Sequence, residues 1–110
     1  MNHDAEEIKK IVAETIRQLK KEGILKSETE IAYHEISARL RQYFRDGETD
    51  PEVAGAIEKL KDDPYIKIIP LFFRYGYTIE AIAETLGAEP RTIYRNKKRL
   101  SLRIHELLED

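Results

Sequence analysis

Hydrophobic residues recur along the whole chain at spacings of three and four positions, which is the pattern of helices that bury one face. The pattern predicts a first helix over residues 4–22, which Gly23 ends. Ser27 and Glu30 have the spacing of a capping box and begin a second helix that runs to about Arg45. The apolar stripe of the first helix consists of Ile8, Ile11, Val12, Ile16 and Leu19. That of the second consists of Tyr33, Ile36, Leu40, Tyr43 and Phe44.

Two Asp-Pro pairs predict the next two helices. Asp50-Pro51 begins a third helix that reaches Lys61, because Asp caps a helix and Pro fits its first turn. Asp63-Pro64 begins a fourth, which contains the most hydrophobic segment of the chain. Pro70 lies inside that helix and removes a backbone donor, so we expect a kink or a break there. No stretch offers a partner for a strand, and the sequence therefore predicts an all-α fold.

The segment from Thr78 to Leu100 predicts two helices joined by a tight turn. Thr78 caps the first of them, which must end at Gly87, and Pro90 begins the second. This is the arrangement of a DNA-binding helix-turn-helix, whose second helix presents its N-terminal half to base edges in the major groove. We therefore expect the chain to be a multi-helix domain with a C-terminal helix-turn-helix.

A rotation of about 100° per residue divides the last helix into two faces. Ile93, Leu100, Ile104 and Leu107 fall on the inner face. The predicted DNA-binding residues lie on or beside the outer face: Arg91, Thr92, Tyr94, Arg95, Lys98 and Arg99. We expect the two N-terminal arginines to approach base edges, with Thr92 and Tyr94 on phosphates or thymine methyl groups, and Lys98 and Arg99 on phosphates. Lys97 falls nearer the buried side, and we expect its stem to carry the ammonium outward.

The charge of the chain is strongly uneven. Between Pro90 and Ile104 there are six basic residues and no acidic one. Removing these six from the 19 basic residues leaves 13 against 21 acidic ones, a net charge of −8, whereas the whole chain is at −2. The basic end of the molecule is thus the end with the helix-turn-helix pattern, as a nucleic-acid-binding protein requires.

Residues 56–108 resemble the ArpU/RinA group of phage-type transcriptional regulators, whose C-terminal half is similar to region 4 of sigma-70 factors. The resemblance is carried by Asp62-Asp63-Pro64-Tyr65, by Phe72-Phe73 with Tyr75, by the helix from Thr78 to Gly87 and by Arg91-Thr92-Ile93-Tyr94-Arg95. Pro70 departs from the pattern, because the family would have an unbroken helix there. The resemblance implies a phage-related or bacterial transcription regulator.

The composition sets the remaining limits. With 110 residues the chain has the size of one compact domain, which we divide into an N-terminal helical pair, residues 1–47, and a helix-turn-helix unit, residues 48–110. It has no Cys, and no apolar run approaches the length that spans a bilayer. The N-terminus lacks a secretion signal, so we expect a cytoplasmic protein without a membrane partner. Three scattered histidines and no catalytic motif indicate no enzyme, no metal and no cofactor.

Two functions from different classes stay open. The first is a sequence-specific transcription regulator that binds double-stranded DNA. The alternative is a protein-interaction module that docks on RNA polymerase or on another regulator. Base edges suit Arg91, Thr92 and Arg95, whereas a docking surface would carry large apolar anchors, and Leu102 is the one apolar residue on that face. The pattern therefore favours DNA.

The apolar stripe of the first helix also allows two interpretations. Helices of this length are marginal alone, so the stripe must be covered. It either folds back on the stripe of the second helix and the segment from Ile66 to Phe73, or it pairs two chains. A DNA reader gains affinity and specificity from two copies on adjacent half-sites, and we therefore favour a homodimer.

Overall fold

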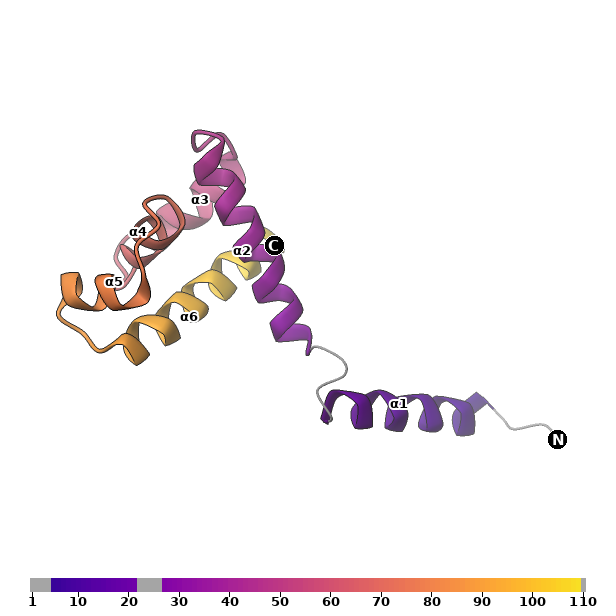
Figure 1. Cartoon of the computed structure of the whole chain (residues 1–110). Coiled ribbons are helices and arrows are strands. Elements are labelled where there is room, and N and C mark those ends of the chain that lie inside the picture. The colour runs from indigo at the N-terminus through magenta and orange to yellow at the C-terminus, as the bar shows by residue number, and fades with distance from the viewer. Residues whose placement is uncertain (1–4, 22–26, 110) are drawn as a thin grey trace. The chain divides into compact units, whose positions relative to one another are not determined.

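The computed structural model describes the backbone of residues 5–21 and 27–109, and the side chains of residues 7–18 and 27–109. Within these ranges it contains six helices and no strand, which confirms the all-α prediction (Figure 1). The helices are α1 (Ala5–Lys21), α2 (Glu28–Arg45), α3 (Pro51–Lys59), α4 (Ile68–Phe73), α5 (Ile79–Leu86) and α6 (Pro90–Glu109). The chain divides into two compact units, one up to Ile31 and one from Ala32 onward.

The first unit contains α1, whose position agrees with the predicted first helix. Ile8, Ile11, Val12 and Ile16 are all exposed, so no described side chain of the first unit covers the apolar stripe. The predicted end at Gly23 and the Leu19 side chain lie outside the described residues. The start of α2 agrees with the predicted cap, because the backbone N–H of Glu30 donates to Ser27 Oγ at 3.1 Å.

The second unit is built around a core to which α2, α3, α4 and α6 all contribute. Its members are Ile36, Leu40 and Tyr43 from α2, Val53 and Ala56 from α3, Ile69 and Phe73 from α4, and Leu100 and Ile104 from α6. The expected boundary between residues 47 and 48 therefore differs from the one in the structure. The buried face of α2 belongs to the C-terminal unit, because α6 and α4 supply the apolar surface that it needs.

A second cluster of buried residues holds α5 in place. Ile68 from α4, Ile82 and Ala83 from α5, and Ile93 from α6 pack together and are all buried. Because Ile93 sits in the first turns of α6, this cluster fixes the N-terminal half of α6 relative to α5.

The start of α3 follows the local signal at Asp50-Pro51. The Asp50 carboxylate accepts from the backbone N–H groups of Glu52 at 3.1 Å and Val53 at 3.3 Å. It also accepts from Arg39 Nε at 3.0 Å, which connects α2 to the start of α3. The helix ends at Lys59, two residues earlier than predicted.

Pro70 changes the fourth helix in a way that the sequence pattern did not predict. The α-helix starts only at Ile68, so Pro70 occupies its first turn and does not break it. Before it, Ile66 N–H donates to Asp63 and Ile69 N–H donates to Ile66, each spanning three residues. Pro70 has no N–H to donate to the Ile66 carbonyl four residues earlier. That carbonyl already accepts from Ile69, so it is not left unpaired. The expected longer helix from Pro64 is replaced by a series of turns.

Candidate nucleic-acid interface

The helices α5 and α6 meet at a tight turn, where the sequence predicts them (Figure 1). Thr78 caps α5, accepting from the N–H of Ala81 at 3.1 Å. Gly87 ends α5 with φ at +66°, and the next N–H, from Ala88, reaches back to Ala83 at 2.9 Å. The Ile93 N–H then donates to Glu89 at 3.1 Å as α6 begins. These local hydrogen bonds help to fix the direction of the first turns of α6 relative to α5.

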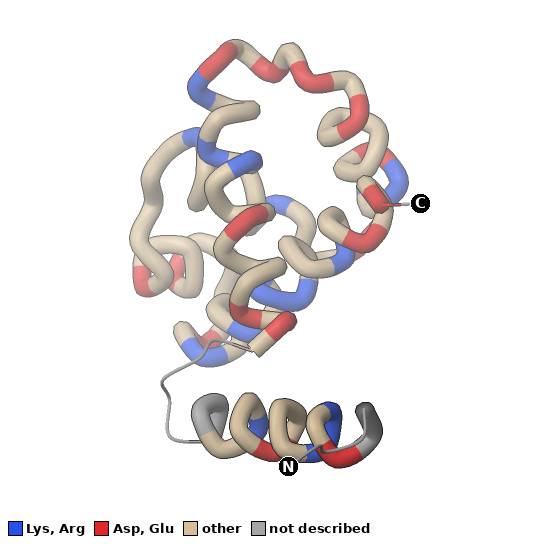
Figure 2. The backbone as a smooth tube through the Cα atoms, turned by 90° about the vertical axis from the view of Figure 1, so that its right-hand side faces the viewer, with Lys and Arg blue, Asp and Glu red and all other residues tan. Residues whose placement is uncertain are grey.

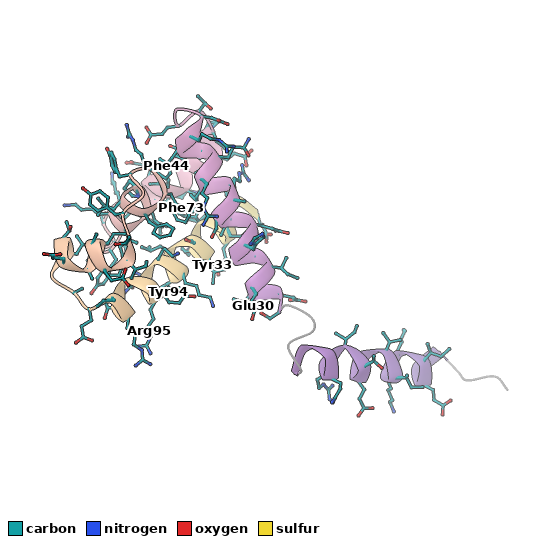
Figure 3. All side chains as sticks on the ribbon, in the orientation of Figure 1. Glu30, Tyr33, Phe44, Phe73, Tyr94 and Arg95 are labelled. Carbon is teal, nitrogen blue, oxygen red and sulfur yellow. The ribbon has the colours of Figure 1, made fainter. Side chains whose placement is uncertain are left out.

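The two faces of α6 agree with the rotation predicted from the sequence. Ile93, Leu100 and Ile104 are fully buried. Arg91, Tyr94, Arg95 and Arg99 are exposed, and Thr92 and Lys98 are half-buried. Figure 3 shows Arg95 directed away from the other helices of the unit, with Tyr94 beside it. The N-terminal half of α6 therefore presents polar and basic side chains to a partner.

Ion pairing separates the cations of α2 and α6 into two groups. Arg39, Arg45, Arg99 and Arg103 each lie within 4.0 Å of a carboxylate. Arg41, Arg91, Arg95, Lys97 and Lys98 have no such partner among the described residues. In Figure 2 the basic positions of α6 lie toward one end of the second unit, and the acidic loop between α2 and α3 lies at the other. The unpaired cations leave a positive charge on α6 that a polyanion can neutralise.

Arg99 has partners within the protein on all its nitrogen atoms. Its Nη1 and Nη2 donate to the Asp63 carboxylate at 2.9 and 3.1 Å, and its Nε donates to Asn96 Oδ1 at 3.0 Å. The hydrogen bond from Arg99 holds the pKa of Asp63 below its usual value. Of the four cations among the six predicted DNA-binding residues, Arg99 is the one with a carboxylate partner within the described residues, in the turn before α4.

Lys97 corrects the expectation that its ammonium reaches outward. The residue is only 7% exposed, and its Nζ lies 3.9 Å from the centroid of the Phe72 ring. Tyr33, Tyr94 and Phe73 stand around it, with ring centroids 5.6, 5.7 and 6.0 Å from Nζ. Burial lowers the pKa of Lys97, and the nearby Arg41 lowers it further, whereas Tyr94 opposes both. The ammonium is therefore held among aromatic faces instead of extending away from the protein.

Tyr33 lies beside the cations of α6, although the sequence pattern placed it only in the apolar stripe of the second helix. Its ring lies 5.7 Å from Lys98 Nζ as well as 5.6 Å from Lys97 Nζ, and Figure 3 shows it between α2 and α6. Burial raises the pKa of its hydroxyl. The sequence signal was a tyrosine at the edge of an apolar stripe. That signal could not predict the lysines beside Tyr33, because they come from another helix.

The exposed side of α5 has the opposite charge to α6. Glu80, Glu84 and Glu89 are exposed, and no basic residue lies between Arg74 and Arg91. Exposed carboxylates repel a polyanion, so the exposed positions of α5 and α6 differ in the kind of partner that they attract.

Other classes of site find little support in the described residues. Nowhere in the described ranges do three side chains of His, Cys, Asp or Glu come together as a metal site would need. Among the helices of the described chain, none combines the length and apolar character needed to cross a bilayer. Comparison with protein families, with curated proteins and with solved structures finds no match to this chain.

Proposed function

We propose that the protein is a sequence-specific transcription regulator that binds double-stranded DNA with α6 in the major groove. The observation that carries this proposal is the set of cations on α6 that lack carboxylate partners while other arginines of α2 and α6 are paired. Unpaired, exposed cations on a helix that follows a tight turn suit a polyanion with base edges in a groove.

The proposed roles follow from position along α6. Arg91 and Arg95 lie one turn apart on the exposed side and have the planar, bidentate geometry that matches guanine O6 and N7. Thr92 and Tyr94 flank them and suit phosphates or thymine methyl groups. Lys98 lies a further turn along, where it can meet a phosphate. The pairing of Arg99 with Asp63 takes Arg99 out of the proposed contact set.

The resemblance to ArpU/RinA regulators and to sigma-70 region 4 agrees with this proposal and adds a phage-related or bacterial setting. A regulator of this kind would act on DNA in the cytoplasm. Binding as a homodimer through α1 remains part of the proposal, supported by the exposed apolar stripe of that helix.

A second candidate function is docking on RNA polymerase or another protein, and one observation favours it. Tyr75 and Tyr77, in the loop before α5, are exposed and pack edge to face with centroids 6.5 Å apart. Arg74 lies over the Tyr75 ring at 5.2 Å. Exposed Tyr and Arg side chains are typical anchors of protein interfaces. This surface is separate in sequence from the exposed face of α6.

Binding of a fluorescent duplex at a series of salt concentrations tests the proposal. A duplex of random sequence should bind, and its affinity should fall with salt with a slope of about −0.9 for each phosphate contacted. Arg95→Ala should weaken binding, whereas Arg103→Gln, which removes an arginine of α6 already paired with Glu106, should leave it nearly unchanged. Absence of binding at low salt, or equal effects of the two variants, would contradict the proposal.

A further inference from the structure

Two lysine ammonium groups of α6 approach the same tyrosine of α2. Lys97 Nζ lies 5.6 Å and Lys98 Nζ 5.7 Å from the Tyr33 ring centroid. Neither ammonium lies within 4.0 Å of a carboxylate in the part of the chain that the structure describes. Arg41 of α2 is a further cation near Lys97, and the aromatic rings screen the repulsion between like charges only in part.

The burial of Lys97 is costly for the fold. A charged group that leaves water needs a counter-charge or several hydrogen bonds, and the rings of Phe72, Tyr33 and Tyr94 supply only cation–π attraction. Apolar side chains of similar volume often replace buried charges without loss of stability. A Met at this position would fill the same aromatic surroundings, so packing alone does not call for an ammonium.

An anion from outside the protein would supply the missing counter-charge. The two tyrosines beside Lys97 carry hydroxyl groups, and the half-buried Lys98 adds a second ammonium next to Tyr33. Such a combination of cations and hydroxyl donors suits a phosphate. The acidic exposed side of α5 repels phosphates, so the strand must be held on another side of α6.

We infer that Lys97, Lys98, Tyr33 and Tyr94 together bind one backbone phosphate of the duplex beside α6. The inference rests on the proposed DNA binding. It assigns roles to Lys97 and Tyr33, neither of which belongs to the exposed face of α6. The single negative charge of the bound phosphate offsets part of the positive charge of the two ammonium groups, and the contact with Tyr33 makes α2 part of the DNA-binding surface.

Variants of Lys97 separate this role from a purely structural one. Lys97→Met should fold with an unfolding temperature equal to or above that of the wild type. It should weaken duplex binding by a factor of about five and reduce the salt slope by about one unit, as expected for one lost phosphate contact. A lysine kept only for packing gives the opposite result, a lower unfolding temperature with unchanged DNA binding, and that result would overturn the inference.

Tyr33→Phe provides a second test that does not depend on how Lys97→Met folds. It keeps the ring and removes the hydroxyl, which also bonds to Ser37, so it should weaken duplex binding and lower the unfolding temperature only by the contribution of that one hydrogen bond. Arg45→Gln is the matched control, because it removes a charge from α2 at a side chain that is 74% exposed and paired with Asp46. Equal affinities of Tyr33→Phe, Arg45→Gln and the wild type would overturn the inference.

Arg95→Ala, measured in parallel, distinguishes failure of the inference from failure of the proposed function. If the wild type binds duplex and Arg95→Ala weakens it while the Lys97 and Tyr33 variants bind normally, only the phosphate site is wrong. If the wild type does not bind duplex at all, the proposed function and the inference both fail.

Discussion

The Arg99 guanidinium donates through Nη1 and Nη2 to the two carboxylate oxygens of Asp63, at 2.9 and 3.1 Å. The Asp63 carboxylate also accepts from the backbone N–H of Tyr65 at 2.9 Å. This pair connects the turns before α4 to the middle of α6, and so helps to hold α6 in its position.

We expect Asp63→Asn to lower the free energy of unfolding by about 1 kcal/mol at pH 7, the range of a well-formed but partly exposed pair. The folded pKa of Asp63 is lowered, so its contribution is complete above the unfolded pKa, about 3.9, and is lost as the pH falls through the folded value. Urea unfolding across this range checks the prediction. A difference between variant and wild type that does not shrink as the pH is lowered into the acid range would contradict it.

Helix ends were largely predictable because their causes are local. Asp50, Thr78 and Gly87 each act on backbone groups within five residues, and all three begin or end helices where the sequence placed them. Pro70 shows the limit of such reasoning. Its effect on the helix depended on whether the preceding residues formed α-helical or shorter turns, which the apolar pattern does not distinguish.

The candidate site was predictable only in its outer face. Rotation along α6 placed Arg91 and Arg95 on the exposed side, but it could not find partners that are distant in sequence. Asp63 lies 36 residues before Arg99, and the rings around Lys97 come partly from α2 and α4. Tertiary packing therefore determines which cations remain available, and no spacing within α6 contains that information.

Lys98→Gln and Arg99→Gln should differ although the residues are adjacent. Lys98→Gln should reduce the salt slope of duplex binding by about one unit without affecting stability, since Lys98 has no carboxylate partner among the described residues. Arg99→Gln should reduce stability and change the salt slope little, because Asp63 already neutralises it. Salt titrations with thermal unfolding measure both effects. Equal slopes for the two variants would show that Arg99 leaves Asp63 to bind a phosphate.

Gly87→Ala should destabilise the protein by about 1 kcal/mol, because φ at Gly87 is +66° and a Cβ is strained there even though nothing lies within 4 Å of it. Gly55→Ala is the matched control: Gly55 lies in α3, also has open space, and has no positive φ. That substitution should stabilise the protein by about 0.5–1 kcal/mol. Chemical denaturation measures both. Changes of the same sign would contradict the proposed part of Gly87 in ending α5.

The homodimer prediction is tested on the exposed stripe of α1. Changing Ile8 and Val12 together to Asp should convert a dimer to a monomer, since both side chains are 51% exposed and lie along the stripe. Ala13→Asp adds a charge off the stripe on the same helix and should leave the dimer intact. Sedimentation at micromolar concentration distinguishes the species. A wild-type protein that sediments at 12.9 kDa alone and that adds only one copy to a duplex in the complex would refute the dimer.

Arg91 and Arg95 carry the proposed sequence readout. Replacing either by Ala should cost about 1–3 kcal/mol on the preferred duplex and less on random DNA, because a lost base contact affects only the matching site. Affinities for the two duplexes measured side by side check this. Equal losses of affinity on the preferred and the random duplex would show that these arginines contact phosphates and not base edges.

Selection of bound duplexes from a random pool, with the wild type and the Arg91→Ala/Arg95→Ala variant in parallel, tests sequence-specific recognition by α6 most directly. The wild type should enrich a motif, and the variant should lose preference at the guanines of that motif while still retaining some DNA. Failure of the wild type to enrich any motif, or enrichment of the same motif by the variant, would contradict recognition by α6.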